Sequence, residues 1–244
     1  MKTMHVLIAI ITLSLRWAAQ AEYILIDFGN NSSFRGTNVV SPDANGNYWN
    51  SVWSGAFYSG LTNTAGSAST VNFGFTTAGG TDYFNGPSGA TQDPSATSYD
   101  SLSLGMLGVD EAVYDWYANS TFQLQNLNPA YTYNLTFFGS RKYVGATNTT
   151  TRYTVYTDNT FSTALTFVDL AVGDGGAEHN SNTVVTLSGL SPQSGNILYV
   201  GFTGNNGGNG YLNAMQIEIV PEPAAVTLLM AGGAVMTLLR RRKM

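Results

Sequence analysis

Alternating apolar and polar residues recur along the chain and predict β-strands. In residues 130–138, apolar side chains from Tyr131 to Phe137 alternate with Thr and Asn, the two-residue period of a half-buried strand. Other segments share this pattern, are rich in β-branched and aromatic residues, and are bounded by Gly, Asn, Asp or Pro. They are residues 23–28, 69–75, 151–157, 182–187, 197–202 and 213–220. Only residues 110–118 suggest a short helix, so the pattern predicts an all-β fold, an antiparallel β-sandwich of jelly-roll type.

A short pattern that occurs twice supports a sandwich. Each copy has two leucines three residues apart and a proline two residues further on, ahead of a strong strand. The copies are Leu124, Leu127 and Pro129, and Leu187, Leu190 and Pro192. We expect the leucines to plug the end of the sandwich and the prolines to stop the hydrogen-bond ladder. The first copy is also similar to the turn before a tyrosine-bearing strand in fibronectin-type modules.

Length and composition indicate one acidic domain between two basic ends. The chain has 244 residues and no cysteine, so it has neither a disulfide framework nor a thiolate metal site. Between Glu22 and Val220 there are fourteen acidic and four basic residues, a balance of −10. Such a body repels phosphate backbones, which argues against nucleic-acid binding. Its abundance of Asn, Thr, Ser, Gly and Tyr suits hydrogen bonding on exposed sheets.

The N-terminus has the form of a signal peptide, residues 1–21. Lys2 precedes an apolar stretch from Val6 to Leu15, and Ala19-Gln20-Ala21 is a small-x-small cleavage site. The alternative is an uncleaved anchor, but ten apolar residues would span only about 15 Å. We therefore expect cleavage before Glu22 and export of the body.

The C-terminal run at 224–239 is a candidate transmembrane helix. It has sixteen uncharged residues, about 24 Å as a helix, which is short for a permanent span. Arg240, Arg241 and Arg242 follow, and they could snorkel to the cytoplasmic surface, as the positive-inside rule requires.

This tail resembles the PEP-CTERM sorting signal of Gram-negative bacteria. The resemblance covers residues 220–244 and rests on Pro221-Glu222-Pro223, the apolar run and the Arg cluster, in that order. It implies recognition of the tripeptide by a membrane enzyme, an exosortase, with cleavage nearby and export linked to exopolysaccharide production. Two prolines cannot continue a strand or a helix, so they suit an extended, exposed site. The alternative is an ordinary single-pass anchor.

The body, residues 22–219, is similar to galactose-binding-like or malectin-like sandwiches. The stretches that carry this resemblance are ILIDFGNN, NYWNSV, YNLTFFGSR and GNGYLNAMQIEIV. It implies carbohydrate binding at loops or on one sheet face, and in some such domains a structural calcium ion.

Catalytic chemistry has few candidate residues. His179 is the only histidine of the body, and without a G-x-S-x-G motif or cysteine it predicts neither a Ser-His-Asp triad nor a zinc site. Paired carboxylates, which glycosidases require, occur in two groups, for which solvated surface acids are the alternative. The groups are Asp110, Glu111 and Asp115, and Asp169, Asp174 and Glu178.

A calcium site has no residue set that we can assign. Asp43, Asn45 and Asn47 begin like an EF-hand loop, but Tyr48 stands where glycine is needed and no Glu falls at the twelfth position. The segment is therefore not an EF-hand, and a structural calcium elsewhere in the sandwich stays open.

Aromatic and polar side chains predict a sugar-binding site. Trp49 and Trp53 flank Asn50, four positions apart, so on one strand the two rings would share a face. A pyranose ring stacks on such side chains, while Asn and Arg bond its hydroxyls. The alternative is that both tryptophans belong to the core. Three cations, Arg141, Lys142 and Arg152, lie on or beside consecutive predicted strands, where they could contact an acidic polysaccharide or pair with nearby Asp.

The sequence thus predicts an exported, non-catalytic protein of the cell surface or extracellular matrix, associated with polysaccharide. We expect its C-terminal membrane anchoring to be transient or permanent, with an exosortase-type enzyme as partner. Two alternatives stay open, a secreted polysaccharide hydrolase and a purely structural surface protein.

Overall fold

The computed structural model describes seven stretches of the chain: residues 21–29, 37–53, 57–76, 83–85, 99–141, 150–173 and 179–221. Of the predicted signal peptide and sorting signal, it describes only Ala21, Val220 and Pro221, and the predicted helix at 224–239 lies outside these stretches. Within them, no helix is both long enough and apolar enough to cross a membrane.

One sheet has five strands in the order β11-β8-β14-β1-β2. Neighbouring strands are antiparallel except β1 and β2, which are parallel, with Leu25 opposite Trp49. The strands are β1 (Glu22–Phe28), β2 (Trp49–Val52), β8 (Tyr131–Phe138), β11 (Val185–Leu190) and β14 (Ala214–Pro221). Because Glu22 pairs with Ile219, the start of β1 and the end of β14 lie side by side.

The second sheet has six strands, all antiparallel, in the order β10-β9-β12-β7-β4-β3. The strands are β3 (Phe57–Tyr58), β4 (Asn72–Phe75), β7 (Ser120–Gln125), β9 (Thr150–Tyr156), β10 (Ala164–Ala171) and β12 (Leu198–Gly204). A small third sheet joins β5 (Tyr83–Asn85), β6 (Asp115–Ala118) and β13 (Tyr211–Leu212).

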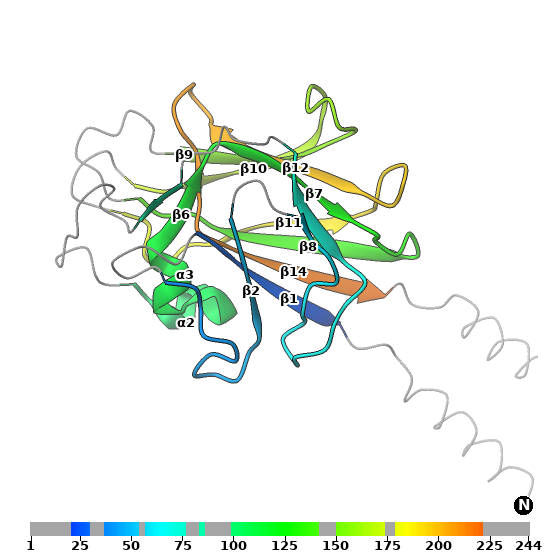
Figure 1. Cartoon of the computed structure of the whole chain (residues 1–244). Helices are drawn as coiled ribbons and strands as arrows, with labels where there is room; N and C mark the ends of the chain where they lie inside the picture. The colour runs from blue at the N-terminus through cyan, green and yellow to red at the C-terminus, as the bar shows by residue number, and fades with distance from the viewer. Residues whose placement is uncertain are drawn as a thin grey trace, which may run out of the picture.

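The two large sheets form two layers, with β9, β10, β12 and β7 above β8, β14 and β1 (Figure 1). The short helices α2 (Ser101–Leu104), η2 (Gly105–Leu107) and α3 (Asp110–Tyr114) lie below the five-stranded layer. The predicted all-β antiparallel fold is confirmed, and each of the seven predicted strand segments overlaps an observed strand.

The predicted helix at 110–118 is correct only in its first half. Helix α3 ends at Tyr114, and the chain continues directly as strand β6. Pairing explains the change, because Tyr117 lies opposite Leu212 on one side and Tyr83 on the other. Sheet contacts thus override the local tendency of these residues to continue the helix.

Alternation within the strands builds the core between the sheets. On β8, Tyr133, Leu135 and Phe137 are fully or almost fully buried against inward side chains of the other sheet. The rings of Phe137 and Tyr153 stack with centroids 4.5 Å apart. Each such Leu or Phe contributes roughly 1.5–3 kcal/mol through burial.

A second cluster covers the other face of the five-stranded sheet. Leu25, Trp49 and Phe138 pack there against Leu104 and Val113 of the helices. Strand β1 is therefore buried on both faces, which accounts for its unbroken apolar run rather than an alternating one.

The leucines of the repeated pattern belong to the core. Leu124, Leu127, Leu187 and Leu190 are all buried in the core between the sheets. In the first copy, the backbone N–H of Asn128 donates a 2.7 Å hydrogen bond to the hydroxyl of Tyr133, which fixes the turn before β8.

Candidate functional site

The two predicted tryptophans do not form one platform. Trp49 is only 5% exposed and belongs to the cluster under the five-stranded sheet, where its indole N–H donates to Asp43 at 2.9 Å. Trp53 follows β2, is 47% exposed, and meets the ring of Tyr58 edge-on at 6.0 Å. The alternative of a core residue therefore applies to Trp49, while Trp53 remains available at the surface.

Asn50 serves the backbone. Its amide N–H groups donate to the carbonyls of Leu25 and Thr62 at 3.0 and 2.8 Å, and its amide oxygen accepts from the N–H of Thr62 at 2.8 Å. These three bonds tie β1, β2 and the segment at Thr62 together. A ligand would have to compete with all of them.

The predicted cations lie in different layers. Arg141 follows β8, and its guanidinium carbon lies 4.1 Å from the ring centroid of buried Trp116 and 5.0 Å from that of Tyr211. Arg152 lies on β9 in the other sheet and forms two 2.8 Å hydrogen bonds with Asp169 of β10. Strands β8 and β9, although consecutive in sequence, thus belong to opposite sheets, and the two arginines contact different partners. Lys142 lies outside the described residues.

The turn at Asp43 is a structural device. One carboxylate oxygen accepts from the N–H groups of Asn45 and Asn47 at 2.8 and 2.9 Å, and the other accepts from Trp49. Burial acts to raise the pKa of Asp43, but these hydrogen bonds outweigh it and leave the pKa below its usual value. The described residues contain no group of three or more His, Cys, Asp or Glu side chains that could hold a metal ion.

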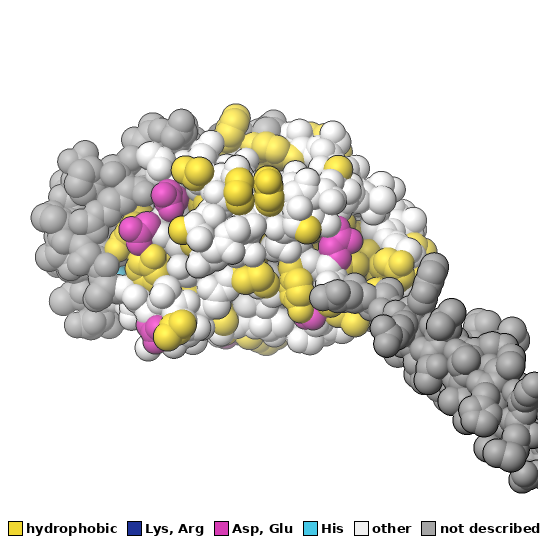
Figure 2. Space-filling view, turned by 90° about the horizontal axis from the view of Figure 1, so that it is seen from below, with side chains coloured by type: hydrophobic (Ala, Val, Ile, Leu, Met, Phe, Trp, Pro, Cys, Tyr) yellow, Lys and Arg dark blue, Asp and Glu magenta, His cyan; other side chains and the backbone are white. Residues whose placement is uncertain are grey.

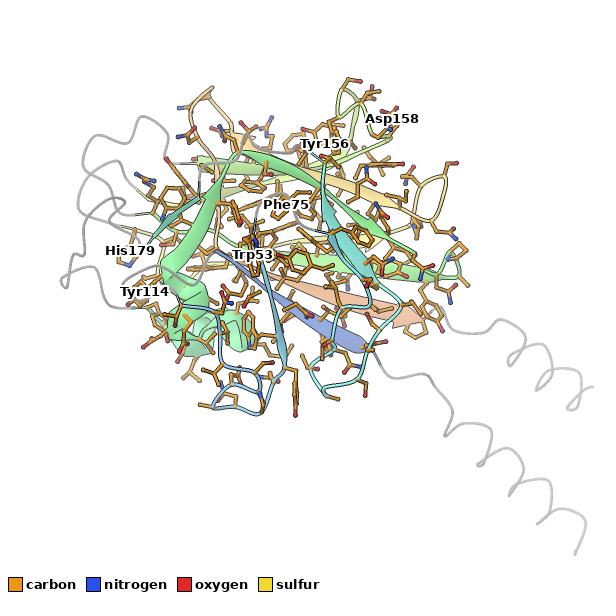
Figure 3. All side chains as sticks on the ribbon, in the orientation of Figure 1. Trp53, Phe75, Tyr114, Tyr156, Asp158 and His179 are labelled. Carbon is orange, nitrogen blue, oxygen red and sulfur yellow. The ribbon has the colours of Figure 1, made fainter. Side chains whose placement is uncertain are left out.

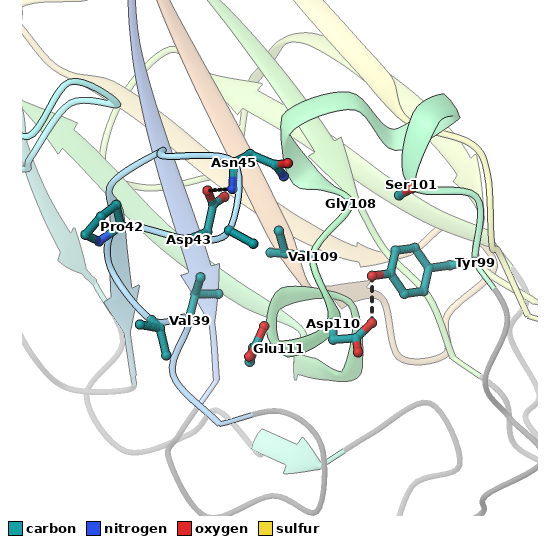
Figure 4. A pocket seen from close by; sticks show the side chains of 12 residues that line it. Val39, Pro42, Asp43, Asn45, Tyr99, Ser101, Gly108, Val109, Asp110 and Glu111 are labelled. Carbon is teal, nitrogen blue, oxygen red and sulfur yellow. Dashed lines mark hydrogen bonds between the residues drawn. The ribbon is translucent and has the colours of Figure 1, made fainter.

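A pocket of about 590 Å³ lies between this turn and the helices (Figure 4). Asp110 and Glu111 line it, and the hydroxyl of Tyr99 donates to Asp110 at 2.6 Å. Burial and then the neighbouring Asp110 raise the pKa of Tyr99, so the phenol stays protonated. Figure 2 looks from below at the side where the helices lie, and it shows acidic side chains and no Lys or Arg.

Of the other predicted acids, Asp169 alone has a described side chain. Asp169 is bound to Arg152 on the six-stranded sheet, and Asp174 and Glu178 lie outside the described residues. His179 is bridged through its backbone to Gly173, at the end of the molecule away from Tyr156 and Asp158 (Figure 3).

A different surface gathers aromatic rings and neutral polar groups: the outer face of the six-stranded sheet. Residues directly opposite each other on antiparallel strands point to the same side of the sheet. On β7, Phe122 and Leu124 point into the core, so Gln123 and its cross-strand partners point outward. These partners form a row across five strands, the aromatic row: Phe57, Gly74, Gln123, Tyr199 and Tyr156.

Small residues form the neighbouring row. This row, the floor, consists of Thr76, Thr121, Gly201 and Thr154. A Cβ added to Gly201 would lie only 3.0 Å from the ring of Tyr156 and 3.1 Å from the Thr121 methyl group. Because glycine has no side chain, the ring of Tyr156 can lie over this part of the floor.

Two hollows mark this face. One, of about 240 Å³, is lined by Asn119, Thr121, Tyr156 and Thr203 with adjacent backbone. The other, of about 330 Å³, is lined by Phe57, Gly74, Phe75, Thr76, Gln123, Gln125 and Asn159. Asn159 belongs to the β9–β10 turn, so this turn reaches over the sheet as far as residues of β3 and β4.

The β9–β10 turn also adds a ring. Phe161 has a φ of +52°, a left-handed conformation that costs a non-glycine residue roughly 1–2 kcal/mol. Its ring lies edge-on to Tyr156 at 5.4 Å and to Tyr199 at 6.1 Å. These contacts hold three aromatic rings together beside the floor.

No protein-family model matches this chain, and no curated protein matches it either. Its function therefore has to be argued from the chemistry of its own surfaces.

The predicted sugar site and this face share only Arg152, which stands at the edge of the face. Sequence reasoning did not select Tyr156, Tyr199, Gln123 or Phe57. The strand containing Gln123 did carry a usable signal, because polar Thr and Gln alternate there with buried Phe and Leu. Nothing in the local sequence indicated which strands pair with one another to align the aromatic row.

Proposed function

We propose that the protein is an exported, non-catalytic carbohydrate-binding protein of the cell surface or extracellular matrix, and that it holds a polysaccharide on the outer face of its six-stranded sheet. The observation that carries this proposal is the register that sets the aromatic row beside the floor. The resemblance to galactose-binding-like or malectin-like jelly rolls agrees with it.

The face has the chemistry that sugar rings require. The apolar face of a pyranose packs on an aromatic ring, and its hydroxyls need donors and acceptors that are fixed in direction. Tyr156 and Tyr199 supply half-buried rings. Gln125 donates to Gln123 at 2.8 Å, which orients both amides on the outer surface. The side-chain NH2 group of Gln123 and the side-chain carbonyl of Gln125 can then bond a ligand.

Export and sorting are part of the proposal. They rest on the signal-peptide pattern at residues 1–21 and on the resemblance of residues 220–244 to a PEP-CTERM signal read by an exosortase-type enzyme. Strand β14 ends at Pro221, so the sheet stops where this signal begins. Of its other predicted residues, Glu222, Pro223, Arg240, Arg241 and Arg242 lie outside the described stretches.

Binding to immobilised polysaccharides tests the proposal with a matched pair of variants. Tyr156→Ala removes a ring from the face and should weaken binding about tenfold, equivalent to about 1.4 kcal/mol. Trp53→Ala removes an exposed ring elsewhere and should leave binding unchanged. Loss of binding in Trp53→Ala but not in Tyr156→Ala would move the site to the predicted tryptophan. Absence of any polysaccharide binding would favour a purely structural protein.

The pocket in Figure 4 favours one competing function, polysaccharide hydrolysis, because Asp110 and Glu111 line it together. Release of reducing sugar by the protein, abolished in Asp110→Asn or Glu111→Gln with the fold intact, would establish an enzyme. Under our proposal the protein releases none.

A further inference from the structure

We infer that the outer face of the six-stranded sheet selects a neutral, linear polysaccharide and rejects a polyuronate. This inference rests on the proposed function, because it concerns the ligand of the same face. Two observations support it: the charged side chains on the face leave no unpaired cation among the described residues, and the floor runs across the strands.

The cation of the face is already neutralised. Arg152 and Asp169 lie directly opposite each other on β9 and β10, and both carboxylate oxygens of Asp169 accept from the guanidinium at 2.8 Å. The flat side of the guanidinium covers the ring of Phe167 at 3.9 Å. Such a planar, bidentate pair fixes the Arg side chain and balances its charge. Its hydrogen bonds to Arg152 hold the pKa of Asp169 below its usual value, so the pair stays charged and closed.

In the part of the chain that the structure describes, the other charge beside the face is negative. Asp158 lies in the β9–β10 turn, where its carboxylate accepts from the N–H and the hydroxyl of Thr160 at 2.9 and 2.6 Å. Among the described residues, no Lys or Arg forms an ion pair with it. With Arg152 and Asp169 cancelling, a chain of carboxylates would meet net negative charge here.

Neutral groups make up the rest of the binding surface. Thr76 and Thr121 of the floor and Gln123 of the aromatic row line the two hollows together with Asn119 and Asn159, while Thr154 of the floor is buried. Hydroxyls and amides pair with sugar hydroxyls without the desolvation cost that a buried charge carries. The face is therefore matched to sugars that carry hydroxyls alone.

The floor also sets the direction of the ligand. Its residues follow the cross-strand pairing, so a bound chain would run perpendicular to the strands, with Tyr156 and Tyr199 on one side and the Arg152–Asp169 pair on the other. The floor crosses three strand intervals, roughly 14 Å, and the aromatic row beside it crosses four, roughly 19 Å. Such a length suits a linear oligosaccharide of several residues better than a single sugar.

The test measures binding of the full chain, in detergent, to linear hexasaccharides by calorimetry. Neutral probes are β-1,4-glucan, β-1,3-glucan and β-1,4-mannan hexamers, and anionic probes are hexagalacturonate and hexaguluronate. We expect a neutral hexamer to bind with an affinity that changes less than twofold between low and high salt. Tyr156→Ala should weaken this binding tenfold or more, and Arg152→Gln should change it less than twofold.

A second variant removes the negative charge that neutralises Arg152. Asp169→Asn keeps the shape of the side chain but frees the charge of Arg152, so it should create salt-sensitive binding of a uronate hexamer that the natural protein lacks. If the natural protein binds a uronate hexamer and Arg152→Gln abolishes this, the inference is overturned while polysaccharide binding by the face stands. If no hexamer binds, the proposed function falls, and the inference falls with it.

Discussion

The carboxyl group of Asp27 lies inside the protein, and its replacement by an amide should change how stability depends on pH. Asp27 is 1% exposed, on the face of β1 that carries the second cluster. One carboxyl oxygen accepts from the N–H of Val39 at 3.1 Å and from the hydroxyl of Ser51 at 2.9 Å. The other oxygen has no hydrogen-bond partner among the described residues. A charge here is only partly compensated.

The magnitude follows from the pKa. Burial raises the pKa of Asp27 from 3.8 to about 6, against the opposing effect of the two hydrogen bonds. The difference corresponds to about 3 kcal/mol between the neutral and the charged carboxyl group. Because the unfolded chain ionises first, the stabilisation is complete below about pH 4 and is lost as the pH rises through about 6.

Urea unfolding of the natural protein and of Asp27→Asn, measured between pH 4 and pH 7, tests this. The variant has no charge at this site at any pH, so the natural protein's stability relative to it should fall by about 2.4 kcal/mol between pH 4 and pH 7. The control is Asp100→Asn at the exposed start of α2, where hydrogen bonds from Ser103 lower the pKa of Asp100. Its difference should stay nearly constant between pH 7 and pH 4 and change in the opposite sense only below about pH 4, where stability is lost as the pH falls. A pH-independent difference for Asp27→Asn would refute the burial argument.

Three further variants test the packing. Leu190→Ala should lower the free energy of unfolding by about 2–5 kcal/mol, because it empties a plug of the core; a loss below about 1 kcal/mol would mean that this end of the sandwich is loosely packed. Tyr133→Phe removes the hydroxyl that accepts from Asn128 and should cost about 1 kcal/mol in urea unfolding, and no loss would show that the turn holds without it. In Gly139→Ala the new Cβ would lie 2.2 Å from the Tyr153 hydroxyl, so we expect a loss of roughly 1–3 kcal/mol or more. The double variant with Tyr153→Phe should recover part of this loss in the same assay, and an equal loss would point to a clash with the backbone.

Alternation between two different faces can be read from the sequence where it is long and regular. Strand β8 shows this, because its buried Tyr133, Leu135 and Phe137 alternate with polar residues. Strand β10 was missed because Leu165 and Phe167, on its outer side, are apolar and about half exposed. Strands β3 and β13 have two residues each, too few for any period. These elements exist through their pairing partners, which a local pattern does not contain.

The candidate site was predicted less well than the fold, for a related reason. Large aromatic residues mark either a core or a ligand surface, and Trp49 belongs to the core. The rings on the outer face come from strands far apart in sequence. The strand order β9-β12-β7-β4-β3 and its register bring Phe57, Tyr156 and Tyr199 into one row. Strand order depends on contacts between distant residues, so composition and spacing could suggest a sugar-binding site but could not locate the surface proposed here.

The asymmetry between the two sheets is the reason for placing the proposed binding face on the six-stranded sheet. The outer side of the five-stranded sheet carries large apolar side chains, Leu25, Trp49 and Phe138. The short helices pack on them and bury them. The six-stranded sheet has its largest rings inside, and outside it carries Thr, Gln and Tyr that stay hydrated. The end of the five-stranded layer holds both Glu22 and Pro221, so attachment of the protein through its C-terminus would leave the outer face of the other layer uncovered. A polysaccharide could then bind along the side of a tethered sandwich, and we expect Tyr156→Ala to reduce binding equally in the tethered and the released protein.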